Sequence, residues 1–311
     1  MSKILNLVNY ELILTTSFEN MHGVSGHLYE MIDYYYITKL NNINVAILLT
    51  DGTTIDTFKK AVIEKYNFSS EELDDLFKNT IECSLPKLIR THNICIVDGA
   101  PRFNDCSIIA DNMFLLRCQC NDFSYFKQQT SIKNTYLLQD YNLYDERTGD
   151  LPIVPIDYVK KILWNKYYTP KDTKTNTALL YLTTNCRALP VDTIKETISR
   201  FSYSKYLILT NDTAKYQSIA SSNVTVQQAP VKDIFDQFDV YIYTSTPNHT
   251  DCSPRFIVEC AVFGKEVVYD IDYVDRGIEC RKAAIKNNLL DLHLNIDDEF
   301  VNIIKDKMHV N

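Results

Sequence analysis

Short apolar runs alternate with amphipathic segments along most of the chain. In the first half, segment 28–40 has apolar residues at helical spacing, and segment 55–79 divides into two polar helices. Apolar runs of strand length lie around these helices, at 4–14, 44–50, 93–98, 113–120 and 135–138. This alternation is typical of parallel strands covered by helices, the α/β class.

The alternation restarts after a stretch that contains several prolines. Residues 149–174 hold three of them, and we place the linker between two domains at about 160–176. Beyond it we expect strands at 178–183, 206–210, 224–228, 240–244 and 267–270, with helices at 191–201, 214–220, 232–238, 276–292 and 297–308. A chain of 311 residues is long enough for two such cores.

The sequence therefore predicts an α/β protein with two Rossmann-like domains. The first spans 1–165, and the second spans 176–311 and includes the C-terminal helices. Ligands of such folds bind beyond the carboxyl ends of the strands. Two sheets that face each other would therefore enclose a ligand-binding cleft between the domains.

The amino-acid composition limits which cellular compartment and which binding partners we expect for this protein. The net charge of −8 opposes a general nucleic-acid coat but leaves room for a local basic cleft. Nine cysteines without a C-x-x-C pair indicate reduced thiols and predict no metal centre. No apolar run approaches ~18 residues, so we expect no membrane span and a cytoplasmic protein, in the host cytoplasm if the source is viral. Only 7 glycines beside 21 tyrosines indicate an AT-rich coding genome, such as that of a phage, a virus or a low-GC bacterium.

Residues 245–270, STPNHTDCSPRFIVECAVFGKEVVYD, carry the clearest functional pattern. A loop with Asp251 and Ser253 leads into a helix, and Ser253 suits its N-cap. Free N–H groups at a helix N-terminus attract an anion, and Arg255 in the first turn would grip phosphate oxygens. Glu259, two turns beyond Asp251, would accept hydrogen bonds from ribose hydroxyls. An amphipathic helix packed on a sheet is the simpler interpretation.

This segment resembles the nucleotide-sugar signature of the GT-B glycosyltransferases, E-x-F-G-x-x-x-x-E-A-x-x-x-G-x-P-V. Asp251 stands at its first Glu, Glu259 at its second and Gly264 at its Gly. The chain departs from the signature at Asp251 itself and at Ser253-Pro254, which replace Phe-Gly. The resemblance implies a nucleoside-diphosphate sugar as donor, with a UDP-sugar as the first choice. It requires neither a metal nor another cofactor.

Two further loops follow predicted strands. The loop 22–27 holds Gly23 and Gly26, which permit close backbone approach to the donor diphosphate or the acceptor. It lacks G-x-G-x-x-G, so a nicotinamide or flavin cofactor is not predicted. The loop 183–187 ends in Arg187, which would stabilise a diphosphate leaving group. For the loop 22–27 the alternative is a plain strand-to-helix turn. For Arg187, and equally for Arg255, the alternative is a structural ion pair.

The order of the elements also resembles the DNA glucosyltransferases of T-even phages. An N-x-x-D loop that ends at Asp251, the following Arg255, and Arg187 after the first strand of the second domain match that group. Its catalytic base is an Asp just beyond a first-domain strand, and Asp122 occupies a comparable place. Asp98 also follows a strand and is the rival base. The sequence does not rank the two.

We expect a glycosyltransferase that moves a sugar from a nucleoside diphosphate to a hydroxyl group. The favoured acceptor is a hydroxymethylated base in double-stranded phage DNA, with Arg90, Arg102, Lys127 and Lys133 around the cleft mouth. A cell-surface glycan or lipid is the alternative acceptor. An epimerase or a non-catalytic nucleotide-sugar binder is the alternative function. Arg255→Ala is expected to weaken donor binding by roughly 1.5–3 kcal/mol without changing thermal stability.

Overall fold

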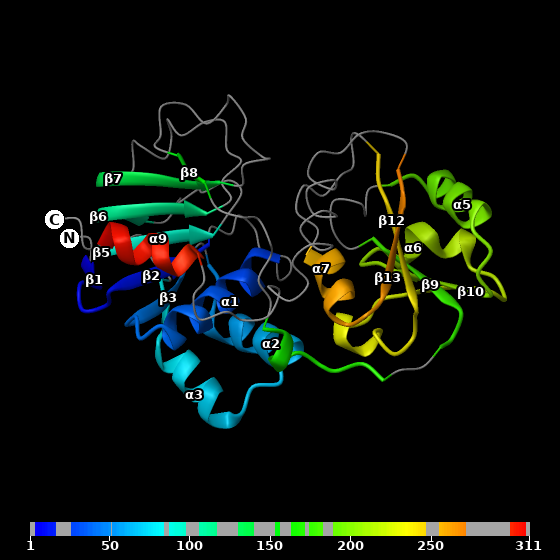
Figure 1. Ribbon diagram of the computed structural model, residues 1–311, viewed down its shortest axis with the longest axis horizontal. Coiled ribbons are helices and arrows are strands. Elements are labelled where there is room, and N and C mark those ends of the chain that lie inside the picture. The colour runs from blue at the N-terminus through cyan, green and yellow to red at the C-terminus, as the bar shows by residue number, and fades with distance from the viewer. Residues whose placement is uncertain are drawn as a thin grey trace. The chain divides into compact units, whose positions relative to one another are not determined.

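The chain divides into two compact units. The first comprises residues 1–163 together with 293–311, and the second comprises residues 164–292. The computed structural model (Figure 1) describes residues 4–16, 26–50, 52–83, 87–97, 106–116, 130–139, 153–155, 163–171, 174–182, 189–246, 255–271 and 299–308.

The first unit is built on an eight-stranded sheet with the order β4-β3-β2-β5-β6-β7-β8, and β1 pairs with β5 beside β2. All strand pairs that the structure describes there are parallel. The strands are β1 (Ile4–Asn6), β2 (Leu12–Thr15), β3 (Val45–Leu49), β4 (Thr80–Glu82), β5 (Lys87–Val97), β6 (Cys106–Leu116), β7 (Thr130–Gln139) and β8 (Ile153–Pro155).

Three helices connect the first strands: α1 (Gly26–Leu40), α2 (Ile55–Lys65) and α3 (Ser70–Lys78). The Thr54 hydroxyl accepts the N–H of Thr57 and caps α2. Ser69 caps α3 in a capping box, in which the Glu72 carboxylate accepts the backbone N–H of Ser69 in return. Local polar residues therefore fix where α2 and α3 begin.

The two halves of the central strand β5 lie in different environments. Residues 94–97 are fully buried, as expected for a parallel sheet that is covered on both faces. In the preceding half, exposed Arg90 and His92 alternate with buried Thr91 and Asn93. This polar half explains why the apolar pattern predicted a strand only from residue 93 onward.

A ladder of asparagines crosses the polar halves of three strands. The side-chain amide of Asn93 donates to Glu11 O at 2.8 Å, and that of Asn112 donates to Asn93 Oδ1 at 2.8 Å. The amide of Asn134 in turn donates to Asn112 Oδ1 at 3.0 Å. The ladder pairs these polar groups with one another, which lets Asn93 and Asn112 lie buried within the sheet.

Two basic residues expected at the cleft mouth lie far from the carboxyl edge of this sheet. Arg90 precedes Val97, the end of β5, by seven residues, or roughly 23 Å of strand. Lys133 lies in the matching part of β7, and its Nζ pairs with Asp111 Oδ1 at 2.6 Å. Neither residue therefore lies at the edge where ligands of such sheets bind, and their place at the mouth of a cleft stays a prediction. Arg102 and Lys127 lie outside the described residues.

The second unit contains a five-stranded parallel sheet with the order β11-β10-β9-β12-β13. Its strands are β9 (Thr177–Tyr181), β10 (Lys205–Leu209), β11 (Val224–Gln227), β12 (Val240–Thr244) and β13 (Glu266–Asp270). The helices between them are α5 (Val191–Arg200), α6 (Thr213–Tyr216) and α7 (Arg255–Val262), and the short 3₁₀ turns of the unit are η2 (Trp164–Lys166), η4 (Gln217–Ile219) and η5 (Val231–Asp233).

Two helices predicted in this unit are shorter in the structure. The segment 214–220 forms the one-turn α6 followed by η4. The segment 232–238 contains only the end of η5 and further turns. These turns are sufficient to bury Ile234, Phe235 and Phe238 in the core without a longer helix. Apolar residues at helical spacing therefore predicted burial correctly, but not helix length.

The last helix, α9 (Glu299–Met308), packs on the first unit. Phe300 is fully buried, and the centre of its ring lies 4.3 Å from the centre of the ring of Tyr34 in α1. Lys305 Nζ donates to Asn41 Oδ1, just beyond α1, at 3.4 Å. The sequence analysis placed this helix in the second domain. Its amphipathic pattern predicts a helix that needs an apolar partner, but does not specify which sheet provides it.

The α/β class with two Rossmann-like parallel sheets is confirmed. In each unit the chain first forms an inner strand of the sheet and then adds strands on one side of it. The chain afterwards adds the remaining strands on the other side of that inner strand. This reversal lies between β2 and β5 in the first unit and between β9 and β12 in the second. A cleft between the units stays a prediction. Among the described residues, no helix is both long enough and apolar enough to cross a membrane.

Phe300→Ala is expected to destabilise the first unit by about 3–5 kcal/mol, because the large cavity left beside Tyr34 cannot fully close. Urea unfolding followed by far-UV circular dichroism measures this change. Lys307→Ala changes the same helix at an exposed ion pair with Asp306 and is the matched control, expected to leave stability unchanged. Equal stability of the two variants would show that α9 is dispensable for the core.

Candidate functional site

The reversal of strand order in the second unit gathers two predicted loops at one edge of the sheet. β9 and β12 are parallel neighbours, with Val240 opposite Ala178 and Tyr241 opposite Leu179. The loop after β9 contains Arg187, and the loop after β12 contains Asp251 and Ser253. These three residues lie outside the described residues. The strands that precede them nevertheless end side by side at the carboxyl edge, where ligands of such sheets bind.

Helix α7 begins at Arg255, directly after the second of these loops. Its first turn contains no acidic residue that would offset the positive end of the helix. At the other end, Gly264 has φ +67, Lys265 N donates to Cys260 O at 2.8 Å, and Gly264 N donates to Ala261 O at 3.2 Å. This is the Schellman arrangement. The Gly of the sequence signature thus has a structural reason, because it ends the helix in the left-handed conformation.

Arg255 and Glu259 form a buried ion pair one turn apart on α7. Arg255 Nε donates to Glu259 Oε1 at 3.0 Å, and the exposed fractions of the two side chains are 6% and 1%. Tyr167, which follows η2, completes a triad. Its hydroxyl accepts from Arg255 Nη2 at 2.7 Å and donates to Glu259 Oε1 at 3.2 Å. Each charge is therefore held by hydrogen bonds inside the protein.

This arrangement places Arg255 in a structural ion pair, one of the two roles that the sequence leaves open for it. Its guanidinium group is held by Glu259 and Tyr167 and lies among buried side chains at the start of α7. Removal of one partner of such a pair leaves the other charge buried without it, which is strongly destabilising. The expectation that Arg255→Ala leaves thermal stability unchanged is therefore revised. Contacts of Arg255 with phosphate, and of Glu259 with ribose, stay predictions.

Sequence reasoning did not find Tyr167. It lies 88 residues from Arg255 along the chain, within a stretch interpreted as linker. The only sequence signal is an aromatic residue in a polar, proline-bearing segment, which does not identify its partner. In the structure Tyr167 is buried, with its ring 5.9 Å from the guanidinium carbon of Arg255.

In the first unit, the structure describes one of the four predicted site residues. Gly26 is the first residue of α1, which follows β2 beside the reversal between β2 and β5. Gly23, Asp98 and Asp122 lie outside the described residues. Asp98 directly follows Val97, the last residue of β5, whereas Asp122 comes six residues after Leu116, the last residue of β6. Of the predicted strand 113–120, residues 113–116 belong to β6, and residues 117–120 lie outside the described residues.

No protein-family model matches this sequence, and no curated protein matches it. Among solved structures, the chain is similar to MurG of Acinetobacter baumannii, with 8% identity, a TM-score of 0.38, and coverage of 95% of this chain and 99% of that one. It is also similar to a UDP-glucosyltransferase from Polygonum tinctorium that glucosylates indoxyl, with 10% identity, a TM-score of 0.40, and coverage of 96% and 92%.

A third similar structure is UGT71G1 of Medicago truncatula, complexed with UDP-glucose, with 8% identity, a TM-score of 0.37, and coverage of 96% of this chain and 93% of that one. Because the TM-scores and identities are this low, the three likenesses support no conclusion about activity. The chemistry must be inferred from this chain's own strands and side chains.

Arg255→Ala is expected to lower the free energy of unfolding by about 3–5 kcal/mol, since Glu259 stays buried without its cation. Tyr167→Phe removes one hydroxyl from the triad and is expected to cost about 1–3 kcal/mol. Urea unfolding measures both changes. Lys195→Ala, which removes an exposed cation from α5 in the same unit, is the control and should stay within about 0.5 kcal/mol of the unchanged protein. An Arg255 variant as stable as this control would contradict the buried-pair interpretation.

Proposed function

We propose that this protein is a glycosyltransferase that moves a sugar from a nucleoside-diphosphate sugar, with a UDP-sugar as the first candidate, to a hydroxyl group. One observation carries the proposal. The parallel neighbours β9 and β12 send their following loops to the same edge of the sheet, and the second loop leads into α7 with Arg255 and Glu259. That edge is where doubly wound sheets bind nucleotides.

In this proposal the diphosphate binds at the N-terminus of α7. The free N–H groups of the first turn and the helix dipole favour an anion there, and no acidic side chain of that turn opposes it. The positive end of the helix dipole is one attraction for the diphosphate. The guanidinium group of Arg187, which follows β9, is the second, and it stabilises the negative charge of the diphosphate as it leaves. Asp251 and Ser253, in the loop before α7, contribute oxygen atoms that orient the donor.

Arg255 and Glu259 support this site from within the unit. The ion pair holds the first two turns of α7 in place, and Tyr167 ties them to the segment after η2. Tyr167 donates to the same carboxylate that would accept a ribose hydroxyl. A carboxylate accepts hydrogen bonds at both of its oxygens, so Tyr167 can orient Glu259 through Oε1 while the ribose hydroxyl is bound as well.

Sheet topology favours Asp98 over Asp122 as the general base. β5 is one of the two strands that flank the reversal in the first unit, and Asp98 is the first residue after it. β6 lies one strand further from the reversal, and Asp122 follows it at a distance of six residues. A base beside the reversal is best placed to take a proton from the acceptor hydroxyl.

Asp98→Asn is expected to lower kcat by about 10²–10⁴, the contribution of a positioned general base, while the KM for the donor stays close to its original value. Asp122→Asn is the matched comparison, since it removes the same charge from a neighbouring loop. Steady-state release of nucleoside diphosphate measures both variants. A larger loss of kcat for Asp122→Asn would assign the base to that residue instead.

For the acceptor we propose a 5-hydroxymethylated base in double-stranded DNA. Support comes from the pattern of Arg187, Asp251 and Arg255 and from a composition that indicates an AT-rich genome, as phages, other viruses and low-GC bacteria have. The net charge of −8 and the position of Arg90 and Lys133 away from the carboxyl edge count against it. Any basic contact surface would then come from other residues. A cell-surface glycan or lipid remains the alternative acceptor.

Duplexes that carry either cytosine or 5-hydroxymethylcytosine, each offered with a set of nucleotide sugars, test donor and acceptor together. The expected result is sugar transfer to the hydroxymethylated duplex alone, falling steeply as salt rises because phosphate contacts release counterions. Mass spectrometry of the nucleosides and release of nucleoside diphosphate are the two measurements. Donor binding in calorimetry without transfer to either duplex would exclude the DNA acceptor. Absence of donor binding would exclude the glycosyltransferase proposal itself.

A further inference from the structure

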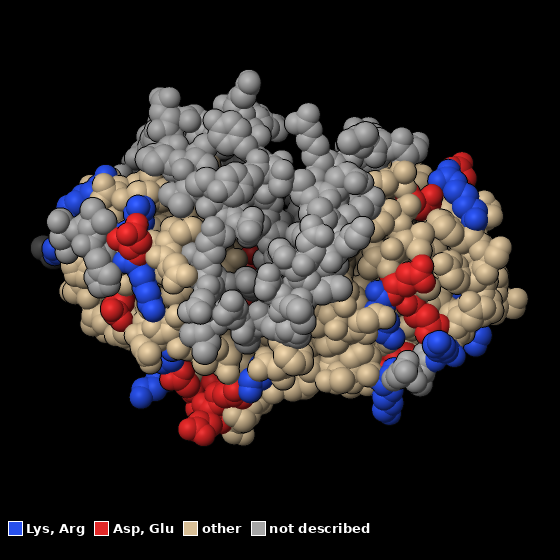
Figure 2. Space-filling model, in the orientation of Figure 1, with Lys and Arg blue, Asp and Glu red and all other residues tan. Residues whose placement is uncertain are grey.

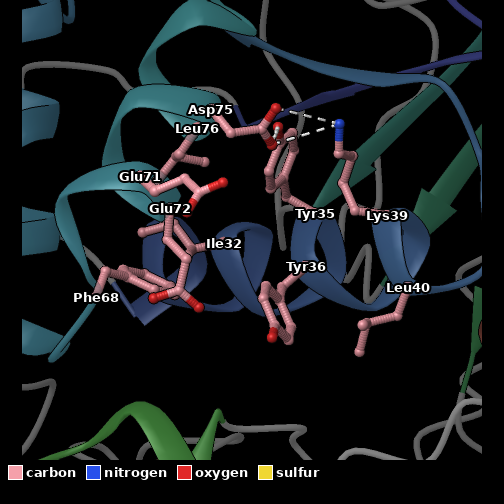
Figure 3. Close-up of a pocket in the computed structure, with 10 residues that line it drawn as sticks. All are labelled: Ile32, Tyr35, Tyr36, Lys39, Leu40, Phe68, Glu71, Glu72, Asp75 and Leu76. Carbon is pink, nitrogen blue, oxygen red and sulfur yellow. Dashed lines mark hydrogen bonds and ion pairs between the residues drawn. The ribbon is translucent and has the colours of Figure 1, made fainter.

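A pocket of about 290 Å³ lies between α1 and α3 in the first unit, away from the carboxyl edge of the sheet. Its apolar wall includes Ile32 from α1 and Leu76 from α3. Three aromatic side chains, Tyr35, Tyr36 and Phe68, complete that wall (Figure 3). The rings of Tyr36 and Phe68 lie 6.3 Å apart at an angle of 41°. The pocket therefore offers tilted ring faces to a small ligand.

The remaining side chains that line the pocket are mostly acidic. Glu71, Glu72 and Asp75 come from α3, and Lys39 is the one basic residue that lines it. Lys39 Nζ pairs with Asp75 at 3.4 Å, and the Glu72 carboxylate is engaged in the capping box. Figure 3 shows Glu71 extending from α3 toward α1. The lining thus has a negative excess, with Glu71 directed toward the space between the helices.

Acidic residues predominate along α3, although Lys78 adds a positive charge in its last turn. Asp74 follows on α3, and Figure 2 shows acidic side chains gathered on this part of the molecule. Tyr35 donates to Asp75 Oδ2 at 3.1 Å, and burial together with the negative charge of Asp75 raises the pKa of the Tyr35 hydroxyl. A negative field therefore reaches into the pocket as well as across its rim. It would repel an anion such as a nucleotide.

We propose that this pocket binds a small organic cation with an apolar body. The aromatic faces of Tyr36 and Phe68 stabilise a positive charge through their ring quadrupoles, and Glu71 adds a carboxylate. The apolar wall takes the rest of the ligand, as in small-molecule sites with few polar groups. Charge and ring faces together select a substituted ammonium over a neutral or anionic compound. This site is separate from the proposed donor site, which lies in the other unit.

Isothermal titration calorimetry of the full chain with benzyltrimethylammonium, and with its neutral carbon isostere neopentylbenzene, tests the proposal. The expected result is saturable binding of the cation and at least about 3-fold weaker binding of the isostere, the difference that a cation–π contact provides. Equal binding of both compounds would overturn the proposal, because the pocket would then be only an apolar crevice. Absence of cation binding at millimolar concentration would overturn it as well.

Three variants locate the site. Glu71→Gln keeps the side-chain volume and is expected to weaken cation binding by about 2- to 5-fold, the range for an exposed ion pair. Phe68→Leu removes one ring face and is expected to weaken it by about 3-fold. Asp74→Asn removes the same charge from α3 at a position that does not line the pocket, and is expected to have the smallest effect. Thermal melting confirms folding of each variant.

Two outcomes of this series would contradict the proposal. If Asp74→Asn weakens binding as much as Glu71→Gln, the cation is attracted by the general charge of α3 and not by the pocket. If a lysine-rich peptide binds the unchanged protein while benzyltrimethylammonium does not, the acidic surface is a protein-docking surface. Weaker cation binding in Glu71→Gln and in Phe68→Leu, with the smallest effect in Asp74→Asn, supports the proposal.

Discussion

The parallel pairing of β9 with β12 is the constraint from which the candidate site follows. These strands are separated along the chain by two other strands, yet their backbones lie side by side. The chain leaves β9 toward β10 on one side, and leaves β12 toward β13 on the other. The two strands end at the same edge of the sheet, which is where doubly wound sheets bind their ligands. β2 and β5 impose the same geometry on the first unit.

Much of this architecture could be predicted because parallel strands are buried on both faces and therefore form apolar runs. The prediction failed where other forces hold a strand. The polar half of β5 around Asn93 is stabilised by the amide ladder, which joins residues about twenty positions apart, and no local pattern reveals such pairing. The helix predicted at 232–238 and the domain predicted for α9 were wrong for a related reason. Apolar spacing indicates that a segment is buried, but not its helix length or its partner.

The features of the candidate site also divide into those that follow from the sequence and those that do not. Arg255 and Glu259 are four residues apart, so their proximity on one helix follows from the sequence alone. Their burial and their shared partner Tyr167 do not, because both depend on packing against a distant segment. A phosphate-binding arginine and a buried structural arginine look identical in a sequence motif. In the structure the exposed fraction of Arg255 is 6%, and its pairing with Glu259 gives it a structural contact that the motif does not reveal, while its contact with phosphate stays a prediction.

The return of α9 to the first unit has a consequence for synthesis. During translation the strands of the first unit leave the ribosome early. The whole second unit is made before three residues of α9 that are fully buried in the structure, Phe300, Val301 and Ile304. Until then the surface of α1 around Tyr34 lacks its cover. The second unit is made of one continuous segment and has no such delay. The unit that starts first is therefore completed last, and its nascent form exposes an apolar surface for most of translation.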